Sequence, residues 1–91
     1  MNVEQAQDIA GVGKSLSVVT RVLIVASLAK GPRAAWTLGD ELKVAQPVMG
    51  YHLALLRMTG VVQRVRKGQE VHYSLNREKL EVVRRFLAGL K

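Results

Sequence analysis

One stretch near the middle of the chain constrains the fold more than any other. Residues 37–59 hold two short segments with apolar residues at helical spacing, separated by only about three residues of turn. The apolar positions are Leu38 and Leu42 in the first segment and Met49, Leu53 and Leu56 in the second. Two short helices joined so tightly form a helix-turn-helix, which we expect over residues 36–59.

The second of these helices has a free face. At about 100° per residue, one stripe of the helix carries Met49, Leu53, Leu56 and Gly60, while the opposite side carries Pro47, Val48, Tyr51 and Ala54. A helix with its side chains fits the roughly 12 Å width of the DNA major groove. Double-stranded DNA is therefore the partner we expect for the outward face.

Size and charge agree with such a partner. The chain has 91 residues and a formal net charge of +7, so its surface attracts polyanions, nucleic acid first and an anionic membrane surface second. A chain this short forms one domain, residues 1–91, with a thin core that gains stability from burial against a second subunit. It contains no cysteine, which excludes disulfides and thiolate metal sites.

Targeting and membrane signals are weak. The first residues include Glu4 and Asp8 and do not form the basic flank of a secretory signal. The longest apolar run, residues 18–29, is interrupted by polar side chains and is far shorter than the roughly 20 residues of a membrane span. We expect a soluble cytoplasmic protein that has no membrane partner.

Two helices are expected before the helix-turn-helix. Residues 3–16 have mixed apolar spacing, and Gly11 and Gly13 weaken a continuous helix there. Residues 18–29 are apolar nearly all round, which favours a central buried helix ending at Lys30, Gly31 and Pro32. A short link, residues 33–35, leads into the helix-turn-helix.

One short segment resembles part of an enzyme motif. Gly11-Val12-Gly13-Lys14-Ser15 is similar to the end of a phosphate-binding loop. That motif needs glycine five positions before Gly13, where this chain has Asp8, and a buried strand in front. We therefore expect no nucleotide site and no catalytic residue, and interpret this segment as a plain helix end with a glycine in a left-handed cap.

The spacing of apolar residues changes from helical to alternating after Gly60. Residues 62–75 alternate on both sides of a turn at Lys67-Gly68-Gln69, which predicts a two-stranded hairpin. We expect Val65, Val71, Tyr73 and Leu75 on its inner side and Arg64, Arg66 and Lys67 on its outer side. Asn76 then caps a helix over residues 77–90, whose wide apolar face needs a partner, either the same helix or the first helix of a second subunit.

This order of elements, together with several short sequence motifs, resembles the ArsR/SmtB family of winged-helix repressors over about two thirds of the chain. The motifs that carry the resemblance are Thr20-Arg21-Val22-Leu23-Ile24, Leu28-Ala29-Lys30-Gly31-Pro32, Leu38 and Leu42, Gln46-Pro47, His52-Leu53, Leu55-Leu56-Arg57, Gly60-Val61-Val62 and Arg66-Lys67-Gly68 with Val71, Tyr73 and Leu75. The resemblance implies a mainly α fold with a β-hairpin, in the order α-α-α-α-β-β-α. It also implies a homodimeric repressor, joined through its first and last helices, that reads an imperfect palindrome with residues 46–59 and touches flanking DNA with the hairpin wing.

The metal positions of that family are not matched. Metal-sensing members carry cysteines near the helix-turn-helix, or Asp and His pairs on the last helix, whereas this chain has only His52 and His72. Two histidines on different elements cannot supply the three or four ligands of a transition metal. We therefore expect no metal and no cofactor. No small-molecule ligand is obvious from the sequence, and release from DNA by a small molecule, by expression level or by nothing stays open.

The candidate DNA-binding residues lie on the turn, the second helix of the motif and the hairpin. Lys43, Arg57 and the hairpin cations are expected near phosphates, and Gly50 close to the DNA backbone. Base edges are expected near Gln46, Val48, Tyr51 and His52, and the alternatives are solvated charges or surface packing. The candidates are Lys43, Gln46, Val48, Gly50, Tyr51, His52, Arg57, Arg64, Arg66 and Lys67. For Gln46 a capping role, for Gly50 simple tolerance and for His52 a packed position stay open, and Trp36 is expected in the core or an interface.

A different class of function fits the same fold. The apolar outward residues Pro47, Val48 and Ala54 would also suit a module that binds another protein, such as an adaptor or an antitoxin-like domain. Replacing Arg64 and Arg66 with glutamate separates the two interpretations, because only DNA binding depends on those charges.

Overall fold

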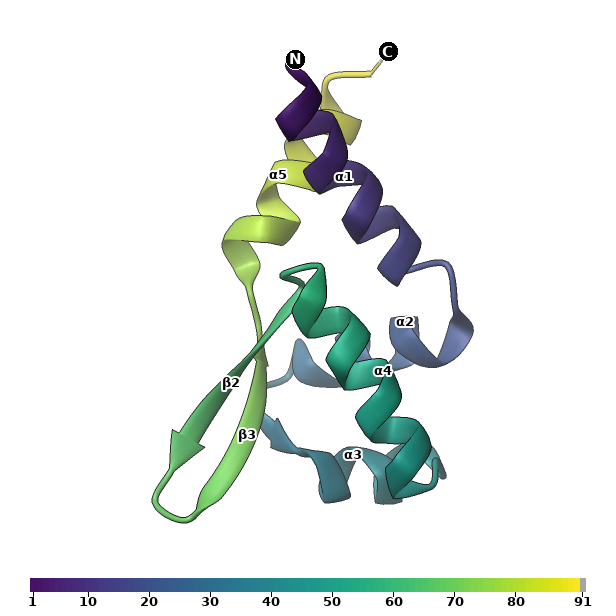
Figure 1. Cartoon of the computed structure of the whole chain (residues 1–91), viewed down its shortest axis with the longest axis vertical. Coiled ribbons are helices and arrows are strands. Elements are labelled where there is room, and N and C mark those ends of the chain that lie inside the picture. Colours follow the sequence, from purple (N-terminus) through teal and green to yellow (C-terminus); the bar gives the residue numbers. More distant parts are fainter. Residues whose placement is uncertain (91) are drawn as a thin grey trace.

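The computed structural model describes residues 1–90, and Figure 1 shows their arrangement. The elements are α1 (Val3–Ser15), α2 (Val19–Leu28), β1 (Arg33–Ala34), α3 (Ala35–Leu42), α4 (Gln46–Met58), β2 (Val62–Lys67), β3 (Glu70–Leu75) and α5 (Arg77–Ala88). The predicted winged helix-turn-helix is confirmed: α3 and α4 form the motif, and β2 and β3 form the wing.

A third strand was not expected. The segment interpreted as a plain link contains β1, which pairs antiparallel with β3 through Arg33 opposite Tyr73 and Ala34 opposite His72. The sheet order is β1-β3-β2. A strand of two residues is too short to show a period of its own, and it forms because the free edge of β3 offers unpaired backbone groups.

The turn of the helix-turn-helix depends on two special positions. Lys43 ends α3 in a left-handed conformation, with φ of 60° and ψ of 44°, and Val44 N–H donates to the Gly39 carbonyl at 2.9 Å. Gly39 is buried where a Cβ atom would lie 2.8 Å from the Val44 carbonyl oxygen. The close approach of the turn to α3 therefore requires glycine at this position.

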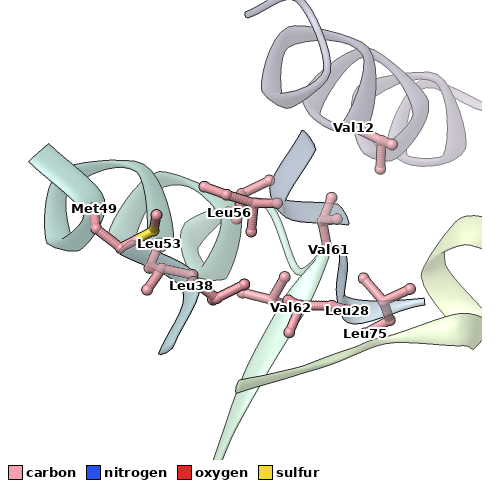
Figure 2. Close-up of a cluster of buried hydrophobic side chains, with 10 residues drawn as sticks. Val12, Leu28, Leu38, Met49, Leu53, Leu56, Val61, Val62 and Leu75 are labelled. Atoms are coloured by element: carbon pink, nitrogen blue, oxygen red, sulfur yellow. The ribbon is translucent and has the colours of Figure 1, made fainter. Parts of the chain in front are cut away.

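The core is one cluster that joins the helix-turn-helix to its surroundings, and Figure 2 shows its side chains. The predicted stripe of α4 is buried, while α5 contributes no fully buried residue. The cluster consists of Val12, Ile24, Leu28, Leu38, Met49, Leu53, Leu56, Val61, Val62 and Leu75. Burial of the α4 stripe sets which side of that helix remains free.

One expectation about burial was wrong. Helix α2 buries only one side: Ile24 and Leu28 are in the core, whereas Val19 is 77% exposed and Leu23 is 48% exposed. Trp36, expected in the core or an interface, is 63% exposed, which leaves the interface as its expected place. A core of this size can cover one face of α2 only, so an all-apolar composition does not make a helix central.

Helices α1 and α5 lie side by side at one end of the molecule, away from the tip of the wing (Figure 1). Helix α1 runs unbroken through Gly11 and Gly13 and starts with a capping box between Asn2 and Gln5. The Lys79 ammonium of α5 lies 3.2 Å from the Asp8 carboxylate of α1. The segment similar to a phosphate-binding loop is helical, and no strand precedes it within residues 1–90. The left-handed glycine cap expected there was wrong, because Gly11 and Gly13 lie inside α1 and neither has a positive φ.

Within residues 1–90, no single helix is both long and apolar enough to cross a membrane. Helices α1 and α2 reach the length and apolar composition of a membrane span only when they are taken together, and the angle between them at their junction is 101°.

Candidate nucleic-acid interface

Helix α4 presents a free apolar face. Because Met49, Leu53 and Leu56 point into the core, the opposite side of the helix is left in solvent. Val48 is 49% exposed, Tyr51 61% and Met58 81%. The face predicted to point outward does so, and it extends to Met58, one residue before the end of the predicted helix-turn-helix.

An open recess separates the second half of α4 from the wing. Apolar groups and three arginines border it, from both the helix and the sheet. The lining residues are Ala54, Arg57 and Met58 of α4 and Val62, Gln63, Arg64, Arg66 and Val71 of the wing. The fold thus brings Arg57 of the helix to the same recess as Arg64 and Arg66 of the hairpin.

The predicted faces of the first wing strand were wrong, whereas Val71, Tyr73 and Leu75 of the second strand lie on the inner side as predicted. In the antiparallel register, Arg64 lies opposite Tyr73 and Arg66 opposite Val71, so both arginines share the face that begins with buried Val62. Val65, expected inside, is 38% exposed and shares the other face with Lys67. Alternation counted from Val62 assigns these faces correctly, whereas choosing the apolar Val65 as inner shifted them by one residue.

The charges of the recess are not neutralised by the protein. Among residues 1–90, Arg57, Arg64 and Arg66 form no ion pair with a carboxylate. Other cations do have such partners: Arg33 pairs with Glu41, Lys79 with Asp8, and Arg84 and Arg85 with Glu81. Three unpaired guanidinium groups around one recess favour an anionic occupant.

Gln46 is directed toward the protein. Its Nε2 donates to the Ala35 carbonyl at 3.3 Å. The side chain lies over Gly39, and this position is open to it because glycine has no Cβ atom. The bond ties the first turn of α4 to the start of α3. Of the two roles left open for Gln46, this geometry fits the structural one better than contact with a base.

His52 lies between the free and buried sides of α4. Its Nδ1 atom is buried and has no hydrogen-bond partner among residues 1–90. Burial, and then the positive charge of Arg21, lower the pKa of His52 below its ordinary value of 6.5. Arg21 itself is buried and donates through Nε to the Ser15 carbonyl at 2.8 Å. His52 is therefore partly packed against the protein, in surroundings that disfavour its charged form.

The remaining candidates are exposed or half-buried. Lys43 lies on the turn between α3 and α4, and Lys67 lies at the tip of the wing, outside the recess. Gly50 faces open space, since an added Cβ would meet no atom within 4 Å. No atom within residues 1–90 requires glycine at this position, so close approach of a ligand and simple tolerance both remain open.

The recess also includes side chains that sequence reasoning did not select as site residues. Met58 and Ala54 are exposed on the free face of α4, and Gln63 precedes the first wing arginine. The signal for Met58 was available, because it follows Tyr51 by seven residues, two turns of the same helix. Whether Gln63 lines the recess depends on the register of the hairpin, which the sequence alone did not give.

Metal-binding geometry is not found in the described chain. Residues 1–90 contain no group of three or more His, Asp or Glu side chains that could hold an ion. His72 lies 3.3 Å from Glu70 on the same strand, and the packed His52 is on another element.

The solved structures that are similar to this chain include a transcriptional regulator and a DNA-binding domain. An ArsR-like transcriptional regulator from Rhodococcus sp. RHA1 superposes with a TM-score of 0.88 at 29% identity, covering 94% of this chain and 81% of that one. A homodimeric winged helix-turn-helix DNA-binding domain from Mycobacterium bovis, a possible ArsR-family regulator, superposes with a TM-score of 0.78 at 26% identity, covering 97% and 82%.

Sequence comparison leads to the same group. The chain is 39% identical over 62 residues to the HTH-type transcriptional repressor SmtB of Mycobacterium tuberculosis, a match covering 68% of this chain. It spans about half of that repressor's length, namely 46%. The profile of the family described as bacterial regulatory protein, arsR family, matches residues 19–64, which is half of the chain. The chain belongs to the arsR family of bacterial regulatory proteins.

Proposed function

We propose that this chain is a cytoplasmic transcriptional repressor that binds a palindromic operator in double-stranded DNA as a homodimer, without a metal cofactor. The observation that carries the proposal is the recess in which Arg57, Arg64 and Arg66 lie beside the free face of α4. Similarity to the mycobacterial repressor and to the homodimeric DNA-binding domain supports the same function.

On DNA, α4 enters the major groove and the wing approaches the adjacent backbone. A phosphate in the recess would accept hydrogen bonds from Arg57 on one wall and from Arg64 and Arg66 on the other. We expect Lys43, at the turn between α3 and α4, to approach a phosphate near the first turn of α4. These contacts fix the register of the protein on the duplex, while the free face of α4 reads the bases.

The dimer is proposed to form through α1 and α5. Helix α5 buries no residue fully, and apolar side chains of both helices are exposed, among them Val3 at 73% and Leu87 at 58%. A groove between the two helices is bordered by Met1, Gln5, Ile9, Val82, Arg85 and Phe86. Two-fold pairing of this end would present two α4 helices about 34 Å apart, one turn of duplex.

The test is selection of bound duplexes from a random pool, together with a mass measurement of the complex. We expect a palindromic consensus and two protein chains per duplex. With three or four phosphates contacted per subunit, the logarithm of affinity should fall against the logarithm of salt concentration with a slope of about −6. A monomer that binds no duplex at low salt would refute the proposal.

Charge reversal in the recess sharpens this test. Arg64→Glu with Arg66→Glu should abolish DNA binding, because both guanidinium groups line the recess. The matched control is Lys14→Glu with Lys30→Glu, which changes the net charge equally at two exposed positions outside the recess. If both double variants lose the same affinity, only the net charge matters and the recess is not the binding site.

The exposed apolar face of α4 is also compatible with binding another protein. A protein partner held by Val48, Tyr51 and Met58 would stay bound to the double variant Arg64→Glu with Arg66→Glu, whereas DNA would not. The two functions are therefore distinguished by the same variant.

A further inference from the structure

The free face of α4 is chemically unusual for a helix that reads DNA bases. Its most exposed side chains are Val48, Tyr51 and Met58, with Ala54 exposed between them. Apart from the Tyr51 hydroxyl, none of these groups forms a strong hydrogen bond. A base edge facing this helix therefore meets mainly carbon and sulfur.

The polar side chains at the borders of that face offer few free hydrogen-bonding groups. The Gln46 amide, which could otherwise pair with adenine in two hydrogen bonds, donates to the Ala35 carbonyl. His52 turns Nδ1 into the interior, where it has no hydrogen-bond partner among residues 1–90, and burial together with Arg21 lowers its pKa and disfavours its charged form. Hydrogen-bonded reading of bases is left to Tyr51, to the Nε2 atom of His52 and to any water.

Charge indicates which occupant this apolar face accepts. Ala54 and Met58 border the same recess as Arg57, Arg64 and Arg66, none of which has a carboxylate partner among residues 1–90. A purely apolar protein helix would leave three guanidinium groups without anions. A duplex supplies both requirements, with phosphates at the rim and, in the major groove, the C5 methyl group of thymine as an apolar feature.

We infer that α4 selects its half-site mainly through thymine C5 methyl groups, which Val48, Tyr51 and Ala54 contact in the major groove. This inference rests on the proposed function and adds the chemical class of bases that the helix recognises. It predicts thymines at the major-groove positions facing the first two turns of α4, since the first turns of a recognition helix contact base edges. Guanine, which needs a bidentate cation for recognition, should be rare at these positions.

The experiment replaces thymine with deoxyuridine in the duplex enriched from a random pool. Deoxyuridine keeps the base-pairing groups and removes only the C5 methyl. At about 0.8 kcal/mol for each buried methyl group, each contacted methyl should account for about a fourfold change in affinity. We expect binding at least about tenfold weaker when both half-sites are substituted, while a random duplex, bound through phosphates, should lose little on the same substitution.

A variant then assigns the effect to the helix. In Val48→Ala the apolar contact is shortened, so the loss caused by deoxyuridine should shrink to less than half of the wild-type loss. The matched control is Val19→Ala, an exposed valine on α2, which should show the full deoxyuridine effect. A double-mutant cycle, which combines Val48→Ala with removal of the thymine methyl groups, measures the coupling between the side chain and the methyl groups.

Failure of the inference is distinguishable from failure of the proposed function. An enriched duplex that binds equally well with deoxyuridine, or whose loss is the same in Val48→Ala, would overturn methyl recognition and leave the repressor intact. A duplex rich in guanine opposite α4 would overturn it as well. If no duplex binds at low salt, the proposed function is itself refuted, and the inference with it.

Discussion

At the scale of single residues, Gly39 and Gln46 set the position of the recognition helix. The Gln46 amide reaches the Ala35 carbonyl only because Gly39 has no side chain beneath it. The bond ties the first turn of α4 to the start of α3, and in the proposed complex Val48 and Tyr51, rather than Gln46, meet the bases.

Gly39→Ala tests this packing. The new Cβ would lie 2.8 Å from the Val44 carbonyl oxygen and closer still to Gln46, so we expect a loss of about 1–3 kcal/mol in the free energy of unfolding. Denaturant titration measures it. Gly13→Ala is the control, because its Cβ would meet no atom within 4 Å, and it should stabilise α1 by up to about 1 kcal/mol. Equal effects of the two variants would contradict the tight turn.

His52 predicts a pH dependence of stability. Its pKa is lowered in the folded chain by burial and by Arg21, so between that value and 6.5 the unfolded chain binds more protons. The free energy of unfolding should therefore decrease as the pH falls below about 6.5. His52→Gln should flatten this part of the profile, as measured by denaturant titration at pH values of about 7.5, 6.5 and 5.5, chosen to bracket the ordinary titration of histidine. An unchanged slope would show that another group causes the decrease.

At the scale of elements, helices with one apolar stripe could be predicted well. The stripe of Met49, Leu53 and Leu56 indicated both the existence of α4 and its free face, because burial of one side determines the other. Helix α2 was harder, since its apolar residues surround it and periodicity does not say which side is covered. Strand β1 escaped prediction because its pairing with β3 is a tertiary contact.

The wing shows how one strand position alters a site. Choosing Val65 as inner placed all three wing cations together, whereas the register separates Arg64 and Arg66 from Lys67. Composition therefore predicted a basic wing, and only the pairing with β3 and the burial of Val62 could show which cations line the recess.

Because Arg64 lines the recess and Lys67 does not, we expect these two wing cations to contribute unequally to DNA binding. Arg64→Ala removes a cation that lines the recess, so we expect weaker DNA binding and a salt slope smaller in magnitude by about 1 per subunit. Lys67→Ala removes the same charge outside the recess and should have the smaller effect. Fluorescence anisotropy at several salt concentrations compares them. A larger effect of Lys67→Ala would place the DNA backbone on the other face of the wing.

At the scale of the whole molecule, the two ends have different surfaces. One end carries α1 and α5 with exposed apolar side chains, and the helix-turn-helix and the wing occupy the rest (Figure 1). Sequence analysis could predict that α5 needs a partner, because its apolar face is wider than α1 can cover. The partner itself lies outside the single chain, and the pairing through this end stays a proposal.

Leu87→Glu tests the pairing. Leu87 is 58% exposed on α5, so a carboxylate there should leave the fold of one chain intact but prevent an apolar interface from forming. We expect a monomer by analytical ultracentrifugation and a salt slope near half of the wild-type value. Val65→Glu, at an exposed position of the wing, should remain dimeric. A dimeric Leu87→Glu would place the interface elsewhere.

The two residues of β1 add a backbone connection to the core that already joins the wing to the helix-turn-helix. Arg33 and Ala34 pair with the middle of β3, and α3 begins at the next residue, so the hairpin is joined to the helix-turn-helix by backbone pairing as well as by buried side chains. In the proposed complex, these two connections set the distance between the hairpin and α4. An operator with one base pair inserted between the positions that these two elements touch would be out of step with it, and no side-chain rearrangement could restore the match.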